Sequence, residues 1–191
     1  MAYALDAVGV PSPRQREEGF KTLLKIVIGQ QISVQAGAAI WDRIEQCLGV
    51  VSAARTLAVH PKTLQKCGLS KQKTAYALEL ASAVQAGKLD FKGLNYLDDQ
   101  TVVTQLTHIK GIGIWTAEIY LMFALGRPDI LPASDLALQL ASQNLFGLKE
   151  KPRPKDLRCI SERWAPHRTS AALILWKFYR NPSCMINIEC K

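Results

Sequence analysis

The stretch that decides the fold runs from His108 to Ala117 and reads HIKGIGIWTA. Apolar residues at helical spacing lead into it and resume after it, which predicts a helix on each side. Gly111 and Gly113 place a tight Gly-x-Gly corner between the two, and this order makes a helix-hairpin-helix. Glycine lets a phosphate approach the backbone, and the free N–H groups at the start of the second helix attract anions. The hairpin therefore predicts a grip on the DNA backbone that does not read base sequence.

Simpler interpretations of these residues stay open. Gly-x-Gly pairs are common and often mark only a corner between packed helices. Asp135 stands in Leu131–Leu136 (LPASDL), and Asp in front of an apolar helix is usually just an N-cap. Neither feature decides the function when it is taken alone.

The rest of the chain repeats the helical pattern without the alternation that is typical of strands. Ser70 is a predicted N-cap, as is either Asp98 or Asp99, and Gly49 and Gly147 stand where helices should end. A charged, proline-bearing connector is expected over Lys149–Asp156. The predicted fold class is all-α, with many short helices: one from Phe20, one up to Gly49, and others over Ser70–Gly87, Asp98–Gly111, Gly113–Gly126, Leu136–Phe146, Leu157–Trp164 and Thr169–Arg180.

The composition fits a folded chain with a basic surface. Among 191 residues, 24 Lys and Arg face 16 Asp and Glu, and the formal net charge of +8 favours a polyanionic partner without deciding it. A hydrophobic fraction of 48% is enough for a substantial core. No apolar run is long enough for a membrane span, and the first ten residues lack the features of a secretion signal. The odd count of five cysteines argues against a disulfide framework and for the reducing cytosol.

Asp135 and the upstream hairpin together resemble the helix-hairpin-helix DNA glycosylase superfamily, in which this connector presents an aspartate to the sugar of an extruded nucleotide. Further motifs, in the family's order, are similar to the branch of bacterial 3-methyladenine DNA glycosylase II. The resemblance covers about residues 20–180. Its other motifs are Ile28–Val34 (IGQQISV), Cys67–Lys73 (CGLSKQK) and Glu162–Arg168 (ERWAPHR) followed by Trp176.

The resemblance implies a single domain over residues 1–191, with two helical lobes around a cleft and the hairpin at 108–117. It makes Asp135 the catalytic carboxylate and Trp115 and Trp176 the walls of the base pocket. Either tryptophan taken singly also fits core packing. The residues implied to contact DNA are Gln31, which enters the gap left by the extruded nucleotide, Lys110, Gly111, Gly113 and Thr116.

Gln31 also attracts notice without the family. It lies on the otherwise apolar stripe of Phe20, Leu24 and Ile28, where a core residue should be apolar. A partly exposed helix end explains it equally well.

At several positions the sequence differs from other members of the family, and each difference excludes a feature that some of those members have. Only about 20 residues precede the first motif, so no N-terminal β domain is expected. Trp115 stands where the strand-cleaving members carry a Schiff-base lysine, which implies a monofunctional hydrolase that leaves an abasic site. Cys184 and Cys190 are too few for the Cys₄ site of an iron–sulfur cluster. No metal or other cofactor is expected, and a monovalent cation at the hairpin is not readable from the sequence.

The implied function is hydrolysis of the N-glycosidic bond of alkylated purines, of the 3-methyladenine type, during base excision repair. N-alkylation already makes the purine a good leaving group, so the carboxylate stabilises the positive charge that develops on the sugar. Trp115 and Trp176 would attract a cationic base by cation–π interaction. The partner is double-stranded DNA with damaged bases, and the protein is expected to be a monomer in the bacterial cytosol and nucleoid, away from membranes.

Two rival functions remain open. A non-catalytic helix-hairpin-helix DNA-binding module would need Gly111 and Gly113 but not Asp135. A helical protein-interaction domain would need none of them. The sequence also leaves open the preferred base among 3-methyladenine, 7-methylguanine, ethenoadenine and deaminated purines.

Overall fold

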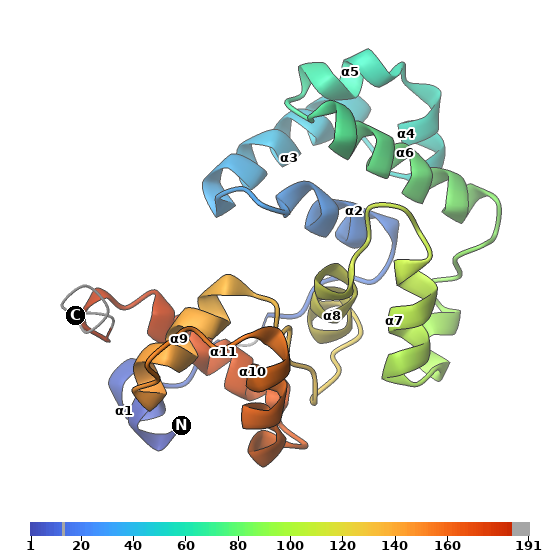
Figure 1. The fold of residues 1–191 in the computed structure, drawn as a ribbon. Helices are drawn as coiled ribbons and strands as arrows, with labels where there is room; N and C mark the ends of the chain where they lie inside the picture. The colour runs from blue at the N-terminus through green and yellow to red at the C-terminus, as the bar shows by residue number, and fades with distance from the viewer. Residues whose placement is uncertain (13, 185–191) are drawn as a thin grey trace. The chain divides into compact units, whose positions relative to one another are not determined.

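The computed structural model describes residues 1–12 and 14–184, and every regular element in these ranges is helical (Figure 1). The predicted all-α class is therefore confirmed for the described residues. The chain forms two compact units. Arg16–Leu125 is called the hairpin unit here, and Met1–Gln15 together with Gly126–Lys191 is called the aspartate unit. None of the described helices has the length and apolar character needed to cross a bilayer.

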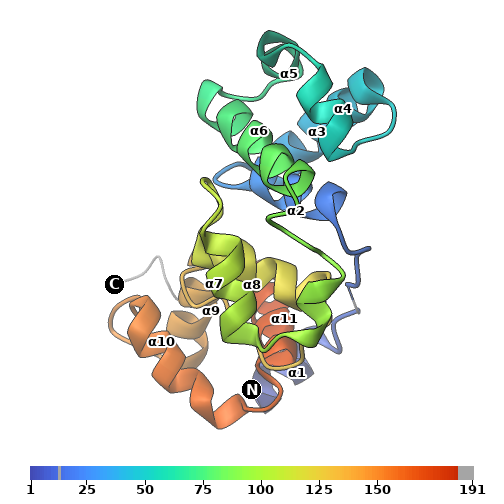
Figure 2. The ribbon, with the colours of Figure 1, turned by 90° about the vertical axis from the view of Figure 1, so that its right-hand side faces the viewer.

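The hairpin unit is organised around α2 and α8. Helix α2 packs against α3, α6 and α8, and α4 packs on α6 (Figure 2). The side chains of α8 are buried from Thr116 through Phe123, so this largely apolar helix, which also buries Glu118, lies in the core of the unit. The elements are α2 (Phe20–Gly29), α3 (Val34–Leu48), α4 (Ala53–Ala58), α5 (Pro61–Lys66), α6 (Lys71–Gln85), η1 (Gly93–Tyr96), α7 (Asp99–Thr107) and α8 (Ile114–Phe123).

Tyr120 anchors the entry of the chain into this unit. Its ring is fully buried on α8, and its hydroxyl accepts a hydrogen bond of 2.8 Å from the backbone N–H of Gly19, directly before α2. Burial raises the pKa of Tyr120 to about 12. The phenol is therefore neutral at physiological pH and acts as a structural acceptor.

The aspartate unit is organised around α11, which packs against both α1 and α9, while α10 packs against α9. Arg168 at the start of α11 donates two hydrogen bonds of 2.7 Å to the carboxylate of Asp129. The elements are α1 (Ala2–Val8), α9 (Leu136–Phe146), α10 (Pro154–Ser161), η2 (Glu162–Trp164), α11 (Arg168–Tyr179) and η3 (Pro182–Cys184).

The predicted helix ends hold where a local cap defines them. Ser70 Oγ accepts from the backbone N–H of Lys73 at 3.1 Å, and Asp98 Oδ1 accepts from that of Thr101 at 2.9 Å. Gly147 ends α9 in the left-handed conformation with φ of 60°. These predictions succeed because a cap involves residues that are neighbours in the chain.

Other boundaries are wrong in the sequence analysis. The connector expected over Lys149–Asp156 ends early, because α10 already begins at Pro154, which suits the first helical position. That helix ends at Ser161, and a 3₁₀ turn follows it. Helices α1, α4 and α5 were not predicted, since six or seven residues are too few to establish a helical period.

Candidate functional site

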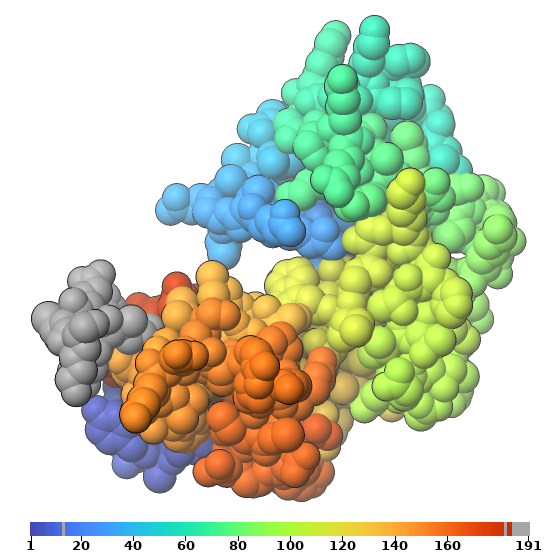
Figure 3. Space-filling view, viewed as in Figure 1, coloured from blue at the N-terminus to red at the C-terminus, as the bar shows by residue number. Residues whose placement is uncertain are grey.

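The hairpin between α7 and α8 offers backbone donors at the protein surface. Gly113 is the N-cap of α8, and no side chain caps this helix end. The N–H groups of Ile114 and Thr116 have no acceptor within the helix, because the first turn lies before the i−4 carbonyls begin. Lys110 and Gly113 are exposed, and the hairpin, yellow in the space-filling view, reaches the surface of its unit (Figure 3). This is the arrangement that binds an anion.

The two hairpin glycines are needed for different reasons. Gly111 has φ of 94°, and a Cβ there would lie 2.1 Å from Cγ of Tyr76 on α6. The packing interpretation therefore applies to Gly111. Gly113 has an ordinary φ of −94°, and a Cβ there would meet nothing within 4 Å. The fold therefore does not require a glycine at 113. A role at the surface, such as close approach of a ligand to the backbone, would explain it.

Thr116 supports the hairpin through a buried side-chain hydrogen bond. Its side chain is buried, and its hydroxyl accepts a hydrogen bond of 2.7 Å from Nε2 of Gln30. The same Nε2 donates to the backbone carbonyl of Gly111 at 3.0 Å. The predicted role of Thr116 at DNA is thus restricted to its backbone N–H. Gln30, which the sequence analysis did not single out, holds the corner and the first turn of α8 together.

Gln31 lies in the turn between α2 and α3 and not on the apolar stripe of a helix, so that part of the sequence analysis is wrong. Helix α2 ends at Gly29, and the side chain of Gln31 is exposed. Gln31 has φ of 55°, the one positive φ of a non-glycine residue among the described part of the chain. A left-handed backbone at such a residue is strained and often accompanies function. Its predicted role in the gap beside the extruded nucleotide stays a prediction.

Lys73 holds this turn in place. Its ammonium group donates to the carbonyl of Ile28 at 2.7 Å and to that of Gln30 at 2.6 Å. Partial burial lowers the pKa of Lys73. A cation on the last carbonyls of α2 satisfies acceptors that the helix itself leaves open and interacts favourably with the helix dipole. Through Lys73 and Gln30, the turn that carries Gln31 and the hairpin form one hydrogen-bonded structure.

Asp135 combines an N-cap with a second side-chain contact. Its Oδ1 accepts the backbone N–H of Leu138 at 3.1 Å, so the N-cap interpretation is correct. The same Oδ1 accepts the indole N–H of Trp176 on α11 at 3.0 Å. A cap alone does not need that second donor. Two directional hydrogen bonds on one oxygen fix the plane of the carboxylate.

The connector that carries Asp135 is held at both of its ends. At the start, the hydroxyl of Thr169 donates to the carbonyl of Arg127 at 2.7 Å and accepts from the N–H of Ile130 at 3.1 Å. At the end, the buried side chain of Gln139 donates to the carbonyl of Ala133 at 2.8 Å. These contacts leave the carboxylate little freedom to move relative to α11.

The predicted site residues thus fall on both units. Asp135 and Trp176 meet in the aspartate unit, whereas Trp115 lies half-buried on the first turn of α8 in the hairpin unit. The pairing of Trp115 with Trp176 across a base pocket stays a prediction. Within the described ranges no group of three His, Cys, Asp or Glu side chains could hold a metal ion, and Cys190 lies outside those ranges.

Comparison with known proteins agrees with this arrangement. Residues 24–167 match the pattern of the HhH-GPD superfamily base excision DNA repair proteins. The chain belongs to this superfamily. DNA-3-methyladenine glycosylase 1 of Schizosaccharomyces pombe is 30% identical over 167 residues, which cover 85% of this chain and 73% of the relative. A Bacillus subtilis relative is 28% identical over 166 residues, and the chain spans 58% of that protein's length.

Solved structures of superfamily members show the same fold. The S. pombe 3-methyladenine DNA glycosylase in complex with abasic DNA matches with a TM-score of 0.87 at 28% identity, over 95% of this chain and 91% of that one. A DNA-3-methyladenine glycosidase from Bacillus halodurans matches with a TM-score of 0.78 at 36% identity, over 89% of this chain and 79% of that one.

The hairpin glycines give a paired test of phosphate binding. We expect Gly113→Val to keep the fold but weaken binding to undamaged duplex about tenfold, because its side chain enters the space where a phosphate would approach. Gly111→Ala should instead destabilise the protein, because the new Cβ collides with Tyr76. Melting temperature and duplex affinity at several salt concentrations separate the two effects. Unchanged affinity and salt slope in Gly113→Val would remove the hairpin as an anchor.

Lys73 gives a test of the turn that holds Gln31. Lys73→Met keeps the length of the side chain and removes both donors, so we expect base extrusion, measured by fluorescence of 2-aminopurine beside the lesion, to fall about tenfold. The loss of stability should be about 1–3 kcal/mol, as for a charge-assisted hydrogen bond. Lys71→Met, which removes an exposed positive charge from the same helix, is the control. Equal extrusion in both variants would limit Lys73 to a structural role.

Proposed function

We propose that this protein is a monofunctional DNA glycosylase that hydrolyses the N-glycosidic bond of alkylated purines in double-stranded DNA, as a step of base excision repair. The observation that carries the proposal is the hydrogen bond from the indole of Trp176 to the carboxylate of Asp135. A DNA-binding module has no use for an aspartate held in this way. The S. pombe neighbour is bound to abasic DNA, which is the product such a hydrolase would leave.

The carboxylate acts on the sugar in this mechanism. As the bond between sugar and base breaks, positive charge develops on the deoxyribose, and a fixed negative group beside it lowers the barrier. Asp135 also orients or deprotonates the attacking water. Because Leu138 and Trp176 already hold Oδ1, the site is organised before the substrate arrives and does not reorganise during the reaction.

Other residues are proposed to bind the extruded base and the DNA backbone. The faces of Trp115 and Trp176 bind the extruded base, while Gln31 occupies the gap that it leaves. Lys110, Gly111, Gly113 and the backbone of Thr116 hold a phosphate, so the grip is independent of sequence. Extrusion is easiest for weakly paired bases, which adds selectivity for damage.

The wider proposal retains the expectations from the sequence. The protein acts as a monomer on damaged duplex DNA in the bacterial cytosol and nucleoid, as one domain of two helical lobes around a cleft, without a cofactor. Release of free bases from methylated DNA, followed by chromatography, is the direct assay of this activity.

The product of the reaction tests the monofunctional assignment. Trp115 stands where a lyase needs an amine, and an indole cannot form a Schiff base. We therefore expect abasic DNA that breaks only after alkali or an added lyase, and no covalent complex after borohydride treatment. Efficient borohydride trapping of the unmodified protein on damaged DNA would overturn the assignment.

The charge of Asp135 tests the mechanism. Asp135→Asn keeps an oxygen that can accept from Leu138 and Trp176 but removes the negative charge. A carboxylate ~4 Å from the sugar cation contributes about 4 kcal/mol at an effective dielectric near 20, so single-turnover excision should fall roughly a thousandfold. Binding to lesion DNA and the melting temperature should change little, because Asn caps about as well as Asp.

Asp98→Asn provides the matched control, because Asp98 caps α7 through the same kind of backbone hydrogen bond. This control should excise at the wild-type rate. If Asp135→Asn also excises within about threefold of wild type, Asp135 is only a cap, and the DNA-binding module becomes the better assignment.

A further inference from the structure

The turn that leads into Asp135 is held at its middle by a side chain from the helix that follows. The carbonyl of Pro132 accepts the N–H of Asp135 at 2.8 Å, which closes a β-turn with Ala133 in its interior. Ala133 is fully buried, so its carbonyl depends on the protein for a donor. Nε2 of Gln139 on α9 supplies one at 2.8 Å. The position of the backbone that carries the carboxylate therefore depends on the orientation of this amide.

Lys151 fixes the orientation of the amide. Its ammonium group donates to Oε1 of Gln139 at 2.7 Å. An ammonium group has only donors, whereas an amide has an acceptor on one side and donors on the other, so Nε2 must face the carbonyl of Ala133. Gln139 is buried, and Lys151 is exposed in the segment between α9 and α10. A chain of hydrogen bonds thus runs from the surface of the aspartate unit to the connector.

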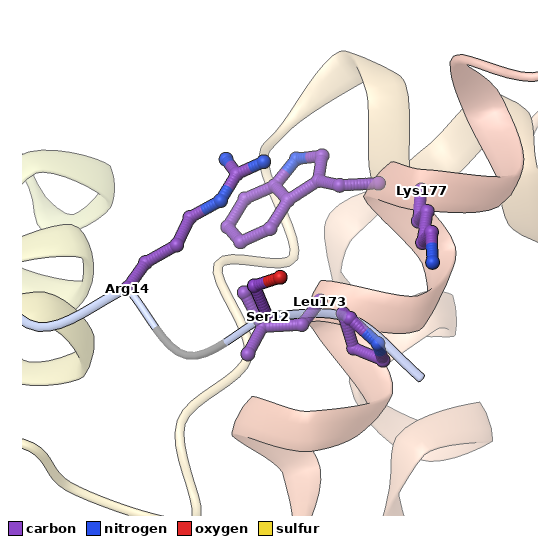
Figure 4. A pocket seen from close by; sticks show the side chains of 6 residues that line it. Ser12, Arg14, Leu173 and Lys177 are labelled. Carbon is purple, nitrogen blue, oxygen red and sulfur yellow. The ribbon is translucent and has the colours of Figure 1, made fainter. Parts of the chain in front are cut away.

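The other donor to the carboxylate, the indole of Trp176, is less firmly packed than a core side chain. A hollow of about 150 Å³ lies between α11 and the N-terminal segment, beside this indole (Figure 4). A side chain that borders a hollow has fewer packed neighbours than one in a close-packed core. The indole therefore directs the carboxylate, while the connector must fix the backbone. The lining of the hollow consists of Pro11, Ser12, Arg14, Leu173, Trp176 and Lys177.

We propose that Lys151 is a positioning residue for base excision, which acts through Gln139 to hold Asp135 in place beside the sugar. The inference rests on the proposed function, because it takes Asp135 as the catalytic carboxylate. A charge that stabilises a transition state works best when it does not reorganise during the reaction. Without Lys151 the amide is no longer restricted to one orientation. In the other orientation its oxygen would face the carbonyl of Ala133, and the contact of two acceptors would displace the connector.

The experiment separates the rate of excision from the binding of DNA. Single-turnover release of 7-methylguanine is measured with the duplex saturated by enzyme, and the Kd for the same duplex is measured separately. Lys151→Met keeps the aliphatic part of the side chain and removes the donor. We expect the rate to fall about tenfold, because a small misplacement of a catalytic group is costly. The Kd and the melting temperature should change little, since the side chain is exposed.

Three further variants make the comparison specific. Lys151→Arg keeps a charged donor and should restore most of the rate. Lys149→Met removes an exposed positive charge from the same segment and should excise at the wild-type rate. Gln139→Met should lower the rate as well, and Lys151→Met should add no further loss to it, because residues that act through one contact are not additive.

Each contrary outcome has its own meaning. An unchanged rate in Lys151→Met, or an equal loss in Lys149→Met, would overturn the inference. A weaker Kd with an unchanged rate would also overturn it, because Lys151 would then bind the DNA backbone. Additive losses in the double variant would exclude the route through Gln139. If the unmodified protein released no base at all, the proposed function itself would be contradicted.

Discussion

The aspartate unit depends on one carboxylate oxygen that receives two N–H groups. Oδ1 of Asp135 binds the first turn of α9 through Leu138 and the side of α11 through Trp176. A single oxygen thus ends the connector, starts one helix and joins it to another. The capping and the proposed catalytic roles are consequences of the same geometry, because a group that must be immobile for chemistry is best placed where the backbone already requires it.

In the hairpin unit, too, a few side-chain hydrogen bonds hold several elements together. Lys73 closes the end of α2, and Gln30 connects the following turn to the carbonyl of Gly111 and the hydroxyl of Thr116. One ammonium group and one amide therefore fix two surface features that come from distant parts of the chain. The hydrogen bonds are partly buried, where they are stronger and where loss of one partner is costly.

The sequence predicted what depends on neighbouring residues. The periodicity of α2 and α9 and the caps at Ser70 and Asp98 are local, and the superfamily resemblance located Asp135 and Trp176. The partners of Gln30 and Lys73 lie far along the chain, and no spacing in a single sequence reveals such contacts. Gly111 shows the same limit, since its need for glycine comes from Tyr76 on another helix. The position of Gln31 was misjudged because the helical period of Phe20, Leu24 and Ile28 was extended to residue 31, whereas α2 ends at Gly29.

The left-handed backbone of Gln31 limits what evolution can place at that position. Glycine and asparagine adopt this conformation most easily, but they have no side chain or only a short one. A longer side chain reaches further from the surface and carries a conformational cost of about 1–3 kcal/mol, which the hydrogen bonds around it must offset. At residue 31, a longer side chain therefore comes at the cost of a less favourable backbone conformation. Exchange of this residue in protein engineering would alter both the length of the side chain and the cost of the backbone conformation.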